Sequence, residues 1–570
     1  MTASAALPRL ASLCGALALA AALSTPAHAA RVAETWGLPG PTGDKAAKPQ
    51  DIAPSERLRI DVGRAPLVAL EPVDNRTLAL EDEIGDTPGK MLRYAIGRPV
   101  ALRAIDGEWT GLADGSRLWV AEVVSPGALG LRLRFDAVEL PDGAELAIYG
   151  VVDGDLAGAG QAAEPAEVHR ALAGGAPEPA FWSGSVAGER ARIEYLAPAG
   201  APPADEVPFR VDQLQHFYRD PLADQLTSKA AGICHNDVAC HPEWADVARG
   251  VARFTFVSGG ASYICSGQLL NDGNADFTPY FLTASHCVDT AKEAGSTEFF
   301  WLYQASSCNG APPSLAAVKR SKGATLVSTG VSSDYSLLIV EGALPSGLFW
   351  EGWTGAAAAT GTAGAAIHHP AGDYKRISFG QKSEGVCSSD HIRVSWTDGP
   401  TEPGSSGSGF FRGDTGQLVG QLHYGPSACG LETYDCYGSF AATFPKVATA
   451  LQGGGDDGSD QNDTCAAART VTKGKLNERI VKVNDEDWYK ITVPAGSTLT
   501  VRLDFVHANG DVDLGFYPSC TGGPFLTSTS ASNVEKVAVK NIGSQAATAW
   551  WRVHLHSDTR NSYKQTVSLK

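Results

Sequence analysis

The chain has 570 residues, of which 43% are hydrophobic and 19% are charged, and its formal net charge is −17. This length exceeds what one hydrophobic core organises, so we expect three or four folded units. The negative charge, which no Lys/Arg-rich run opposes, argues against nucleic acid and anionic membrane surfaces as partners. The 63 glycines and 33 prolines indicate turn-rich β structure.

The first 29 residues have the pattern of a signal peptide. Arg9 precedes an apolar run, 10–23, and Ala27-His-Ala29 has the small-x-small form of a cleavage site. The run is too short to span a bilayer, and no later stretch approaches about 20 uninterrupted apolar residues. We therefore expect a secreted protein without a membrane-embedded part. Cys14 leaves with this segment, and the ten remaining cysteines predict disulfides in an oxidising compartment.

Residues 30–229 contain no cysteine and predict a β-sandwich. Their β-like runs, 118–124, 129–135, 145–149 and 191–196, alternate with Pro/Gly/Asp turns. A cysteine-free unit between a signal peptide and a cysteine-rich unit resembles a propeptide that assists folding. We expect this unit to be the enzyme's own propeptide partner, with a permanent accessory domain as the alternative.

Lys229 marks the predicted end of this propeptide. It lies among small residues in Thr227-Ser-Lys-Ala-Ala-Gly-Ile-Cys234, just before the first cysteine of the next unit. An enzyme that cuts after lysine can release itself here, so we expect maturation cleavage at Lys229.

Residues 230–451 hold eight cysteines and a dense series of short strands. The strand-like runs are 254–257, 263–270, 280–283, 299–303, 335–340, 391–396 and 418–423. Separated by Gly/Asn/Asp turns, they predict an all-β double barrel. Val447 and Leu451, at i, i+4 spacing, predict a short helix at its end.

Three stretches of this unit carry candidate catalytic residues. An apolar strand runs into His286, Asp334 opens another strand, and Ser406 lies in Thr401-Glu-Pro-Gly-Ser-Ser-Gly-Ser-Gly409. Small residues let a tight turn present the Ser406 hydroxyl, and they leave the amides of Gly404 and Ser406 free to stabilise an oxyanion. The order His, Asp, Ser is that of chymotrypsin-type enzymes. Adjacent His368 and His369 point apart on a strand, so they do not favour a metalloprotease.

Residues 452–462 read as a flexible acidic linker, and residues 463–570 as a small β-sandwich that Cys465 and Cys520 staple together. The runs 484–497 and 510–517 resemble the bacterial pre-peptidase C-terminal domain, an accessory module of peptidases. We interpret its aspartates as solvated turns, with a site for a cation such as Ca²⁺ as the alternative.

The double-barrel unit resembles the bacterial lysyl endopeptidases of the Achromobacter and Lysobacter type, within the chymotrypsin-like fold. The motifs that carry the resemblance, in order, are Phe281-Leu-Thr-Ala-Ser-His-Cys, Ser333-Asp-Tyr-Ser-Leu-Leu, Ala366-Ile-His-His-Pro, Lys375-Arg-Ile-Ser, the Ser406 loop and Gly420-Gln-Leu-His-Tyr-Gly-Pro-Ser. The resemblance implies His286 as general base, Asp334 as its orienting partner and Ser406 as nucleophile, with an acyl-enzyme that water hydrolyses. It implies no metal and no cofactor.

The same resemblance implies how a basic substrate residue is selected. Asp435 matches the aspartate at the floor of the family's S1 pocket, which receives the side chain before the cleaved bond. Trp396 and His423 match the tryptophan and histidine that flank the family's active site. Ser405 replaces the aspartate that precedes the nucleophile in trypsin-like zymogens, so activation through an ion pair with a new N-terminus is not expected here.

The resemblance also implies three disulfides: Cys234 with Cys429, Cys240 with Cys308 and Cys265 with Cys287. Cys387 and Cys436 are left over, depart from the family's pattern, and are expected to pair. Because Cys436 follows Asp435, such a bond fixes one wall of the S1 pocket.

We therefore expect a secreted serine endopeptidase that cuts protein or peptide substrates after lysine. One alternative is an enzyme that cuts after arginine, or after both basic residues. The alternative of another class is a non-catalytic adhesin or protease homologue whose C-terminal module carries the function.

Overall fold

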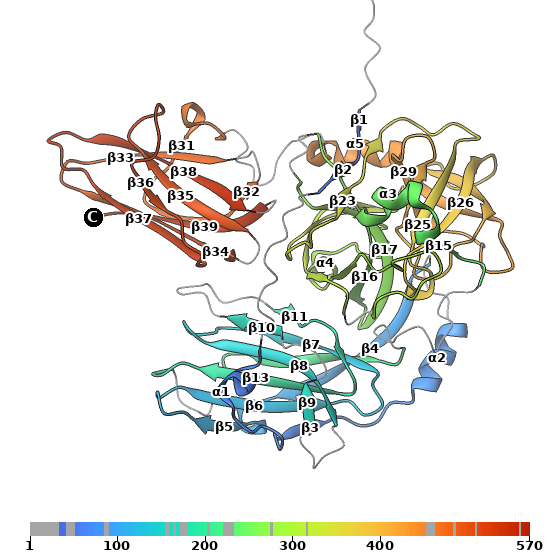
Figure 1. Cartoon of the computed structure of the whole chain (residues 1–570), viewed down its shortest axis with the longest axis horizontal. Coiled ribbons are helices and arrows are strands. Elements are labelled where there is room, and N and C mark those ends of the chain that lie inside the picture. The colour runs from blue at the N-terminus through green and yellow to red at the C-terminus, as the bar shows by residue number, and fades with distance from the viewer. Residues whose placement is uncertain are drawn as a thin grey trace, which may run out of the picture.

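The computed structural model describes most of the chain as three β-rich units (Figure 1). The described residues are 33–40, 52–84, 90–153, 160–162, 167–170, 180–201, 206–219, 233–273, 277–314, 317–451, 462–482, 486–507, 510–557 and 560–570. The expectation of a mainly β protein is confirmed. The predicted signal peptide and Lys229 lie outside the described residues, as does all of the predicted linker except Asn462. No helix among the described residues is long and apolar enough to cross a membrane.

The N-terminal unit is a β-sandwich of two sheets. The first sheet contains β3 (Leu67–Ala69), β5 (Glu108–Gly111), β6 (Arg117–Val124), β8 (Glu145–Asp153), β9 (Gly160–Ala162), β10 (Glu167–Arg170) and β13 (Arg190–Ala197). The second contains β4 (Leu92–Leu102), β7 (Gly130–Asp136), β11 (Phe181–Trp182), β12 (Val186–Ala187) and β14 (Arg210–Phe217). Two helices, α1 (Pro54–Leu58) and α2 (Asn75–Ile84), accompany the sheets.

Side-chain alternation explains this sandwich. Trp119 and Val123 of β6, spaced by even steps, point into the same core as Leu131 and Phe135 of β7. In a strand, residues two apart share a face, so each sheet presents one continuous apolar face to the other. The predicted β-sandwich is thereby confirmed.

The middle unit is a double β-barrel, as the sequence predicted. Its first half is an open barrel of β16 (Val251–Ser258), β17 (Ala261–Leu270), β18 (Tyr280–Thr283), β19 (Glu298–Trp301), β20 (Arg320–Lys322), β21 (Ala324–Gly330) and β22 (Tyr335–Val340). Its second half contains β25 (Ala363–His368), β26 (Arg376–Ser383), β27 (His391–Asp398), β28 (Gly409–Arg412), β29 (Leu418–Tyr424) and β30 (Tyr434–Ser439). These strands pair in the cycle β28-β25-β26-β27-β30-β29-β28, which closes the barrel.

Shorter elements complete the double barrel. They are β15 (Asn236–Asp237), α3 (Ala245–Gly250), α4 (Ala291–Gly295), β23 (Phe349–Trp350), β24 (Trp353–Thr354) and α5 (Phe440–Leu451). The predicted terminal helix corresponds to α5, where Val447 and Leu451 are buried with Trp353 in the core between the two halves.

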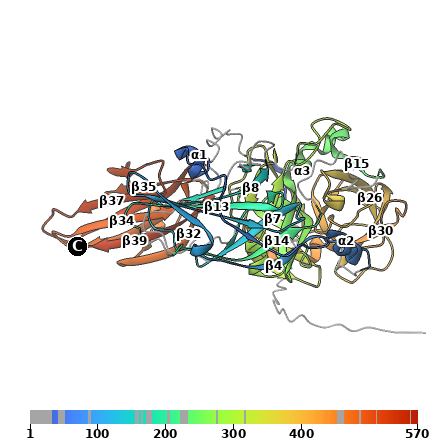
Figure 2. The same ribbon diagram turned by 90° about the horizontal axis from the view of Figure 1, so that it is seen from below.

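Strand β4 joins the N-terminal sandwich to the double barrel. It pairs antiparallel with β14 in its own unit and with β17 in the first barrel, which creates one 12-stranded sheet across the two units. Figures 1 and 2 both show β4 passing from the sandwich into the barrel region. Farther upstream, β1 (Glu34–Thr35) pairs with β24 and β2 (Leu38–Pro39) pairs with β23. The stretch expected to form one N-terminal unit therefore also contributes its residues 33–40 to the double-barrel unit.

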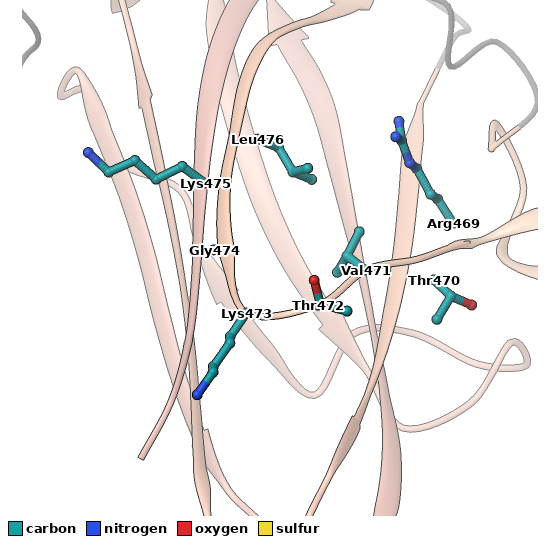
Figure 3. Close-up of a pocket in the computed structure, with 8 residues that line it drawn as sticks. All are labelled: Arg469, Thr470, Val471, Thr472, Lys473, Gly474, Lys475 and Leu476. Carbon is teal, nitrogen blue, oxygen red and sulfur yellow. The ribbon is translucent and has the colours of Figure 1, made fainter.

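The C-terminal unit is a second sandwich. Its sheets contain β31 (Arg469–Thr470), β33 (Asp487–Val493), β35 (Asp511–Tyr517), β36 (Leu526–Ser528) and β38 (Ala547–Ser557) on one side, and β32 (Gly474–Lys482), β34 (Thr498–Phe505), β37 (Val534–Lys540) and β39 (Arg560–Leu569) on the other. A pocket at its surface is lined by residues 469–476 (Figure 3). That lining has no histidine, cysteine or carboxylate.

Five disulfides staple the described chain. The pairs are Cys234–Cys429, Cys240–Cys308, Cys265–Cys287, Cys387–Cys436 and Cys465–Cys520. They are the five expected pairs, and the first four lie in the double barrel.

Candidate active site

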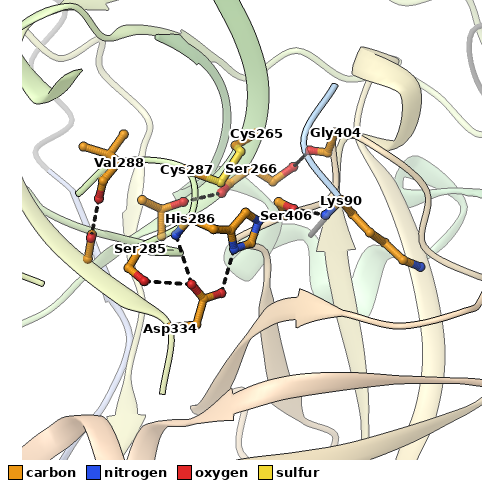
Figure 4. Close-up of a disulfide and its surroundings, with 12 residues drawn as sticks. Lys90, Cys265, Ser266, Ser285, His286, Cys287, Val288, Asp334, Gly404 and Ser406 are labelled. Carbon is orange, nitrogen blue, oxygen red and sulfur yellow. Dashed lines mark hydrogen bonds and ion pairs between the residues drawn. A yellow bond between two sulfur atoms is a disulfide. The ribbon is translucent and has the colours of Figure 1, made fainter. Parts of the chain in front are cut away.

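The three candidate catalytic side chains meet between the two barrels (Figure 4). His286 follows β18, Asp334 precedes β22, and Ser406 precedes β28, so His286 and Asp334 come from the open barrel and Ser406 from the closed one. His286 Nδ1 lies 2.7 Å from Asp334 Oδ2, and His286 Nε2 lies 2.7 Å from Ser406 Oγ. These two contacts connect a hydroxyl, an imidazole and a carboxylate in the order that general-base activation of the hydroxyl requires.

Asp334 is held in an unusual backbone conformation that aims its carboxylate at the imidazole. Its φ is +53°, a left-handed value that aspartate tolerates better than most residues. Ser285 Oγ and the His286 amide donate to Asp334 Oδ1 at 2.8 and 3.0 Å, and Gln421 Nε2 donates to the Asp334 carbonyl at 3.2 Å. Burial by itself raises the pKa of Asp334, but the charge and hydrogen bond of His286 lower this pKa below its ordinary value. The carboxylate is therefore ionised and oriented.

The loop around Ser406 needs glycine at two positions. Gly404 has φ +99°, and a Cβ there would lie 2.7 Å from the His369 carbonyl. Gly407 has φ +81°, and a Cβ there would lie 2.1 Å from Thr283 Oγ1. Both φ values are left-handed, and both positions lack room for a side chain. The chain thus turns sharply on either side of Ser406 and exposes its hydroxyl to His286.

Strand β17 fixes the same loop from the open barrel. The Ser266 amide donates to the Ser406 carbonyl at 2.8 Å, and Ser266 Oγ donates to the Gly404 carbonyl at 2.9 Å. These two bonds hold two backbone carbonyls of the loop against β17. Sequence reasoning did not identify Ser266, since a serine on a strand has no distinctive pattern.

Asp435 is fully buried and is hydrogen-bonded to Thr401 at the start of this loop. Its Oδ2 accepts hydrogen bonds from Trp396 Nε1 and Thr401 Oγ1, each at 2.7 Å, and from Ser427 Oγ. A Cβ on Gly425 would lie 2.1 Å from Asp435 Oδ1, so a side chain at this position would collide with the carboxylate. Trp396, expected to flank the active site, thus contacts the Asp435 carboxylate.

A lysine from the N-terminal unit lies against Asp435. Lys90 Nζ lies 2.9 Å from Asp435 Oδ1. It also donates within 3.0 Å to the carbonyl and hydroxyl oxygens of both Thr401 and Ser427. Burial lowers the pKa of Lys90, and the negative charge of Asp435 opposes that change. Neither Lys90, Thr401 nor Ser427 was identified from the sequence, because only the fold brings them to Asp435.

His423 lies beside the catalytic imidazole. The rings of His286 and His423 stack at 24°, with centroids 5.4 Å apart, and His423 Nδ1 lies 3.8 Å from Asp334 Oδ2. His391 Nε2, which the sequence did not suggest, lies 2.8 Å from His423 Nδ1. Burial lowers the pKa of His423 to about 4, despite the opposing charge of Asp334. His423 is therefore a neutral neighbour of His286 near neutral pH.

The adjacent His368 and His369 do not share a ligand position. His368 is hydrogen-bonded to Ser405 Oγ at 2.7 Å, whereas His369 Nδ1 lies 2.9 Å from the Asp373 carbonyl. Burial lowers the pKa of both histidines well below the ordinary value. Both are neutral structural groups, and His368 anchors the serine that precedes the nucleophile.

Two groups of potential metal ligands lie close together among the described residues. One is His286, Asp334 and His423, the histidine–carboxylate arrangement described above. The other contains Cys234 and Cys429, whose sulfurs are already joined in a disulfide.

The comparisons with known proteins agree with this architecture. A family model described as "Lysyl endopeptidase, C-terminal domain" matches residues 228–438, and "Lysyl endopeptidase N-terminal domain" matches residues 69–218. A lysyl endopeptidase of Pseudomonas aeruginosa is 30% identical over 406 residues, which cover 65% of this chain and 84% of that protein. Secreted RxLR effector protein 73 of Plasmopara viticola is 25% identical over 236 residues, which cover 38% of this chain and 56% of the effector.

Among solved structures, the thermostable serine protease AL20 from an extremophilic microorganism matches 36% of this chain and 98% of its own, with 16% identity and a TM-score of 0.26. The active form of the Rv3671c protease from M. tuberculosis matches 40% of this chain and 92% of its own, with 16% identity and a TM-score of 0.28. At these TM-scores neither structure adds to the assignment.

Proposed function

Because this chain belongs to the lysyl endopeptidase family and is a serine endopeptidase, we propose that it cuts the peptide bond after lysine through Ser406, His286 and Asp334. The observation that supports the lysine preference most directly is the bound ammonium of Lys90, 2.9 Å from Asp435 Oδ1. The 2.7 Å contacts of His286 with Ser406 and Asp334 support the catalytic roles.

The proposed reaction follows from the chemistry of these groups. His286 Nε2 takes the proton of Ser406 as its oxygen adds to the substrate carbonyl carbon, and Asp334 stabilises the imidazolium that forms. The amides of Gly404 and Ser406 stabilise the resulting oxyanion. His286 then gives the proton to the departing amine. Water, activated by the same histidine, hydrolyses the acyl-enzyme.

The shape of the S1 pocket favours lysine over arginine. Five oxygens, from Asp435, Thr401 and Ser427, converge within 3.0 Å of one nitrogen position. An ammonium is a compact charge whose donors rotate about one atom, whereas a guanidinium spreads its donors over a planar fork. Oxygens that converge on a point therefore suit an ammonium better than a fork.

Export and maturation complete the proposal. Residues 1–29 act as a signal peptide, and the enzyme releases its mature part by cutting after Lys229. The reasons are the sequence patterns of these segments, which lie outside the described residues, together with the proposed preference for lysine.

The catalytic roles are tested with Ser406→Ala in the mature enzyme. Turnover of a lysyl peptide is expected to fall by roughly 10⁶-fold, since loss of the nucleophile leaves only binding and oxyanion stabilisation. A small uncharged fluorophosphonate should label the parent and not the variant. Labelling of neither protein would instead favour a non-catalytic homologue.

The specificity is tested by mass spectrometry of a protein digest made with the purified enzyme. New carboxyl ends at lysine, and few at arginine, are the expected result. Equal cutting after both residues would contradict the argument from the converging oxygens.

A further inference from the structure

Lys90 does more than place an ammonium in the S1 pocket, because its backbone also lies against the catalytic groups. The Gly404 amide donates to the Lys90 carbonyl at 2.6 Å, and the Lys90 amide donates to Ser406 Oγ at 2.8 Å. Figure 4 shows the Lys90 backbone beside Ser406, with its side chain extending away from His286. The carbonyl of Lys90 thus lies where the proposed oxyanion forms.

The residues after Lys90 continue through the site as a bound strand. Met91 is buried in the same apolar cluster as the Cys265–Cys287 disulfide next to His286. Leu92 and Arg93 then pair antiparallel with Ile264 and Tyr263 of β17. Backbone pairing of this kind is how a protease edge strand binds an extended peptide.

The Lys90–Met91 bond therefore spans the catalytic groups as a substrate bond does. Its carbonyl side lies at the S1 pocket and the oxyanion donor, and its amine side leads along β17. Contacts fix the chain on both the Lys90 side and the Met91 side of this bond. A surface lysine that only lies near a carboxylate would lack the contacts on the second side.

The N-terminal sandwich holds the chain on both sides of this bond. Asp82 of α2, upstream of the bond, accepts from Arg93 Nε at 2.5 Å and from Tyr218 Oη at 2.6 Å, both downstream. Asn75 Oδ1 of the same helix lies 2.8 Å from His216 Nε2. If water hydrolysed the bond, giving a Lys90 carboxylate and a Met91 amine, these contacts would still hold the two pieces on one scaffold. The new ends would stay beside Ser406 and hinder the entry of another substrate.

We propose that the N-terminal sandwich inhibits the enzyme from within, by holding the Lys90–Met91 bond in the position of the bond to be cut. This inference rests on the proposed function, since it takes Asp435 as the S1 carboxylate. It assigns Lys90 a role separate from that of Lys229: Lys90 blocks the site, and cleavage at Lys229 would free the inhibited precursor for later dissociation of the sandwich.

The test uses the full chain with Lys229→Gln, which removes the expected maturation cleavage. Mass spectrometry first confirms that each preparation is uncleaved at position 229, and only such preparations are assayed. The measured quantity is hydrolysis of N-acetyl-lysine p-nitroanilide, a substrate small enough to need little more than the S1 pocket. Adding Lys90→Gln is expected to raise the rate at least tenfold. Arg210→Gln, which removes an exposed positive charge from β14 of the same sandwich, is the matched control and should leave the rate unchanged.

Equal rates with and without the Lys90→Gln change would overturn the proposal, whether both were low or both high. The mature enzyme, assayed beside these full-length variants on lysyl and arginyl anilides, separates failure of the internal-inhibitor proposal from failure of the proposed lysine specificity. Cleavage of the lysyl anilide by the mature enzyme, without an effect of Lys90→Gln, refutes only the internal inhibitor. Absence of a lysine preference in the mature enzyme refutes the proposed function as well.

A second measurement needs no activity and detects a folding defect. In full-length Ser406→Ala, the effects of Lys90→Gln and Asp435→Asn on the Tm should be strongly non-additive, because each single change leaves the other charge buried and unpaired. Additive effects in folded variants would contradict the contact on which the inhibitor depends.

Discussion

The indole of Trp396 donates a hydrogen bond from Nε1 to Asp435 Oδ2 across 2.7 Å. Trp396 is on β27 and Asp435 is on the neighbouring β30, so the sheet sets their separation. The bond occupies one oxygen of the carboxylate and leaves Oδ1 to face the ammonium of Lys90. Trp396 thus acts as a positioning residue for the proposed S1 carboxylate.

Trp396→Phe should weaken substrate binding more than chemistry. The change removes one hydrogen bond to a charged group, which typically contributes about 1.5–3 kcal/mol, and leaves the triad contacts in place. We expect KM for a lysyl peptide to rise by roughly tenfold or more, with a smaller change in kcat. Steady-state kinetics measure both. A fall in kcat alone would place Trp396 in the catalytic step instead.

Asp435→Asn should have a larger effect on the same substrate. It keeps the shape of the side chain and leaves a buried ammonium without its counter-ion, a loss of about 3–5 kcal/mol. The expected fall in kcat/KM on lysyl substrates is roughly 10²- to 10⁴-fold. Labelling of Ser406 by a small uncharged fluorophosphonate should persist. Full activity of the variant on lysyl peptides would mean that another group determines specificity.

His423 should make the folded enzyme sensitive to acid. Its pKa is lowered to about 4 by burial, against the opposing charge of Asp334, while the neighbouring His286 and His391 add to the lowering. Between this value and the ordinary value of about 6.5, the unfolded chain binds a proton that the folded chain does not. Stability therefore falls as the pH drops from about 6.5 toward 4, by about 1–2 kcal/mol for this residue at pH 5.

Urea unfolding at pH 7 and pH 5 measures this contribution. The free energy of unfolding should drop more for the parent than for His423→Gln, because the variant has no imidazole to protonate at this position. Other buried histidines, such as His368 and His369, act equally in both proteins. Equal drops in the two proteins would show that His423 titrates alike in the folded and unfolded chains.

The Cys387–Cys436 disulfide should stabilise the backbone next to Asp435, the proposed S1 carboxylate. It closes a loop with a sequence separation of 49 and includes the residue after Asp435. Replacing both cysteines by serine is expected to cost about 2–5 kcal/mol in stability. The difference between parent and variant in urea unfolding measures it. Non-reducing peptide mapping of the parent should find no free thiol at either position, and free thiols there would refute the pair.

Local sequence was sufficient for much of the fold and for proposing the candidate catalytic residues. The apolar runs at Tyr280–Thr283 and Tyr335–Val340 are strands with these same bounds. They could be predicted because burial and turn chemistry leave a signal within a few neighbouring residues. His286 and Ser406 were suggested in the same way, since each lies in a short motif with its own chemistry.

Tertiary structure alone decided which residue lies against Asp435 and how Asp334 is aimed. Lys90 and Ser406 are separated by 316 positions in the chain, and they meet only because β4 pairs with β17 of another unit. A single lysine in a turn has no periodicity that records such a pairing. The left-handed φ of Asp334 likewise depends on contacts from other segments, notably Ser285 and Gln421. A sequence motif predicts only features that depend on neighbouring residues of one segment. Contacts between distant segments form only when whole sheets pack together.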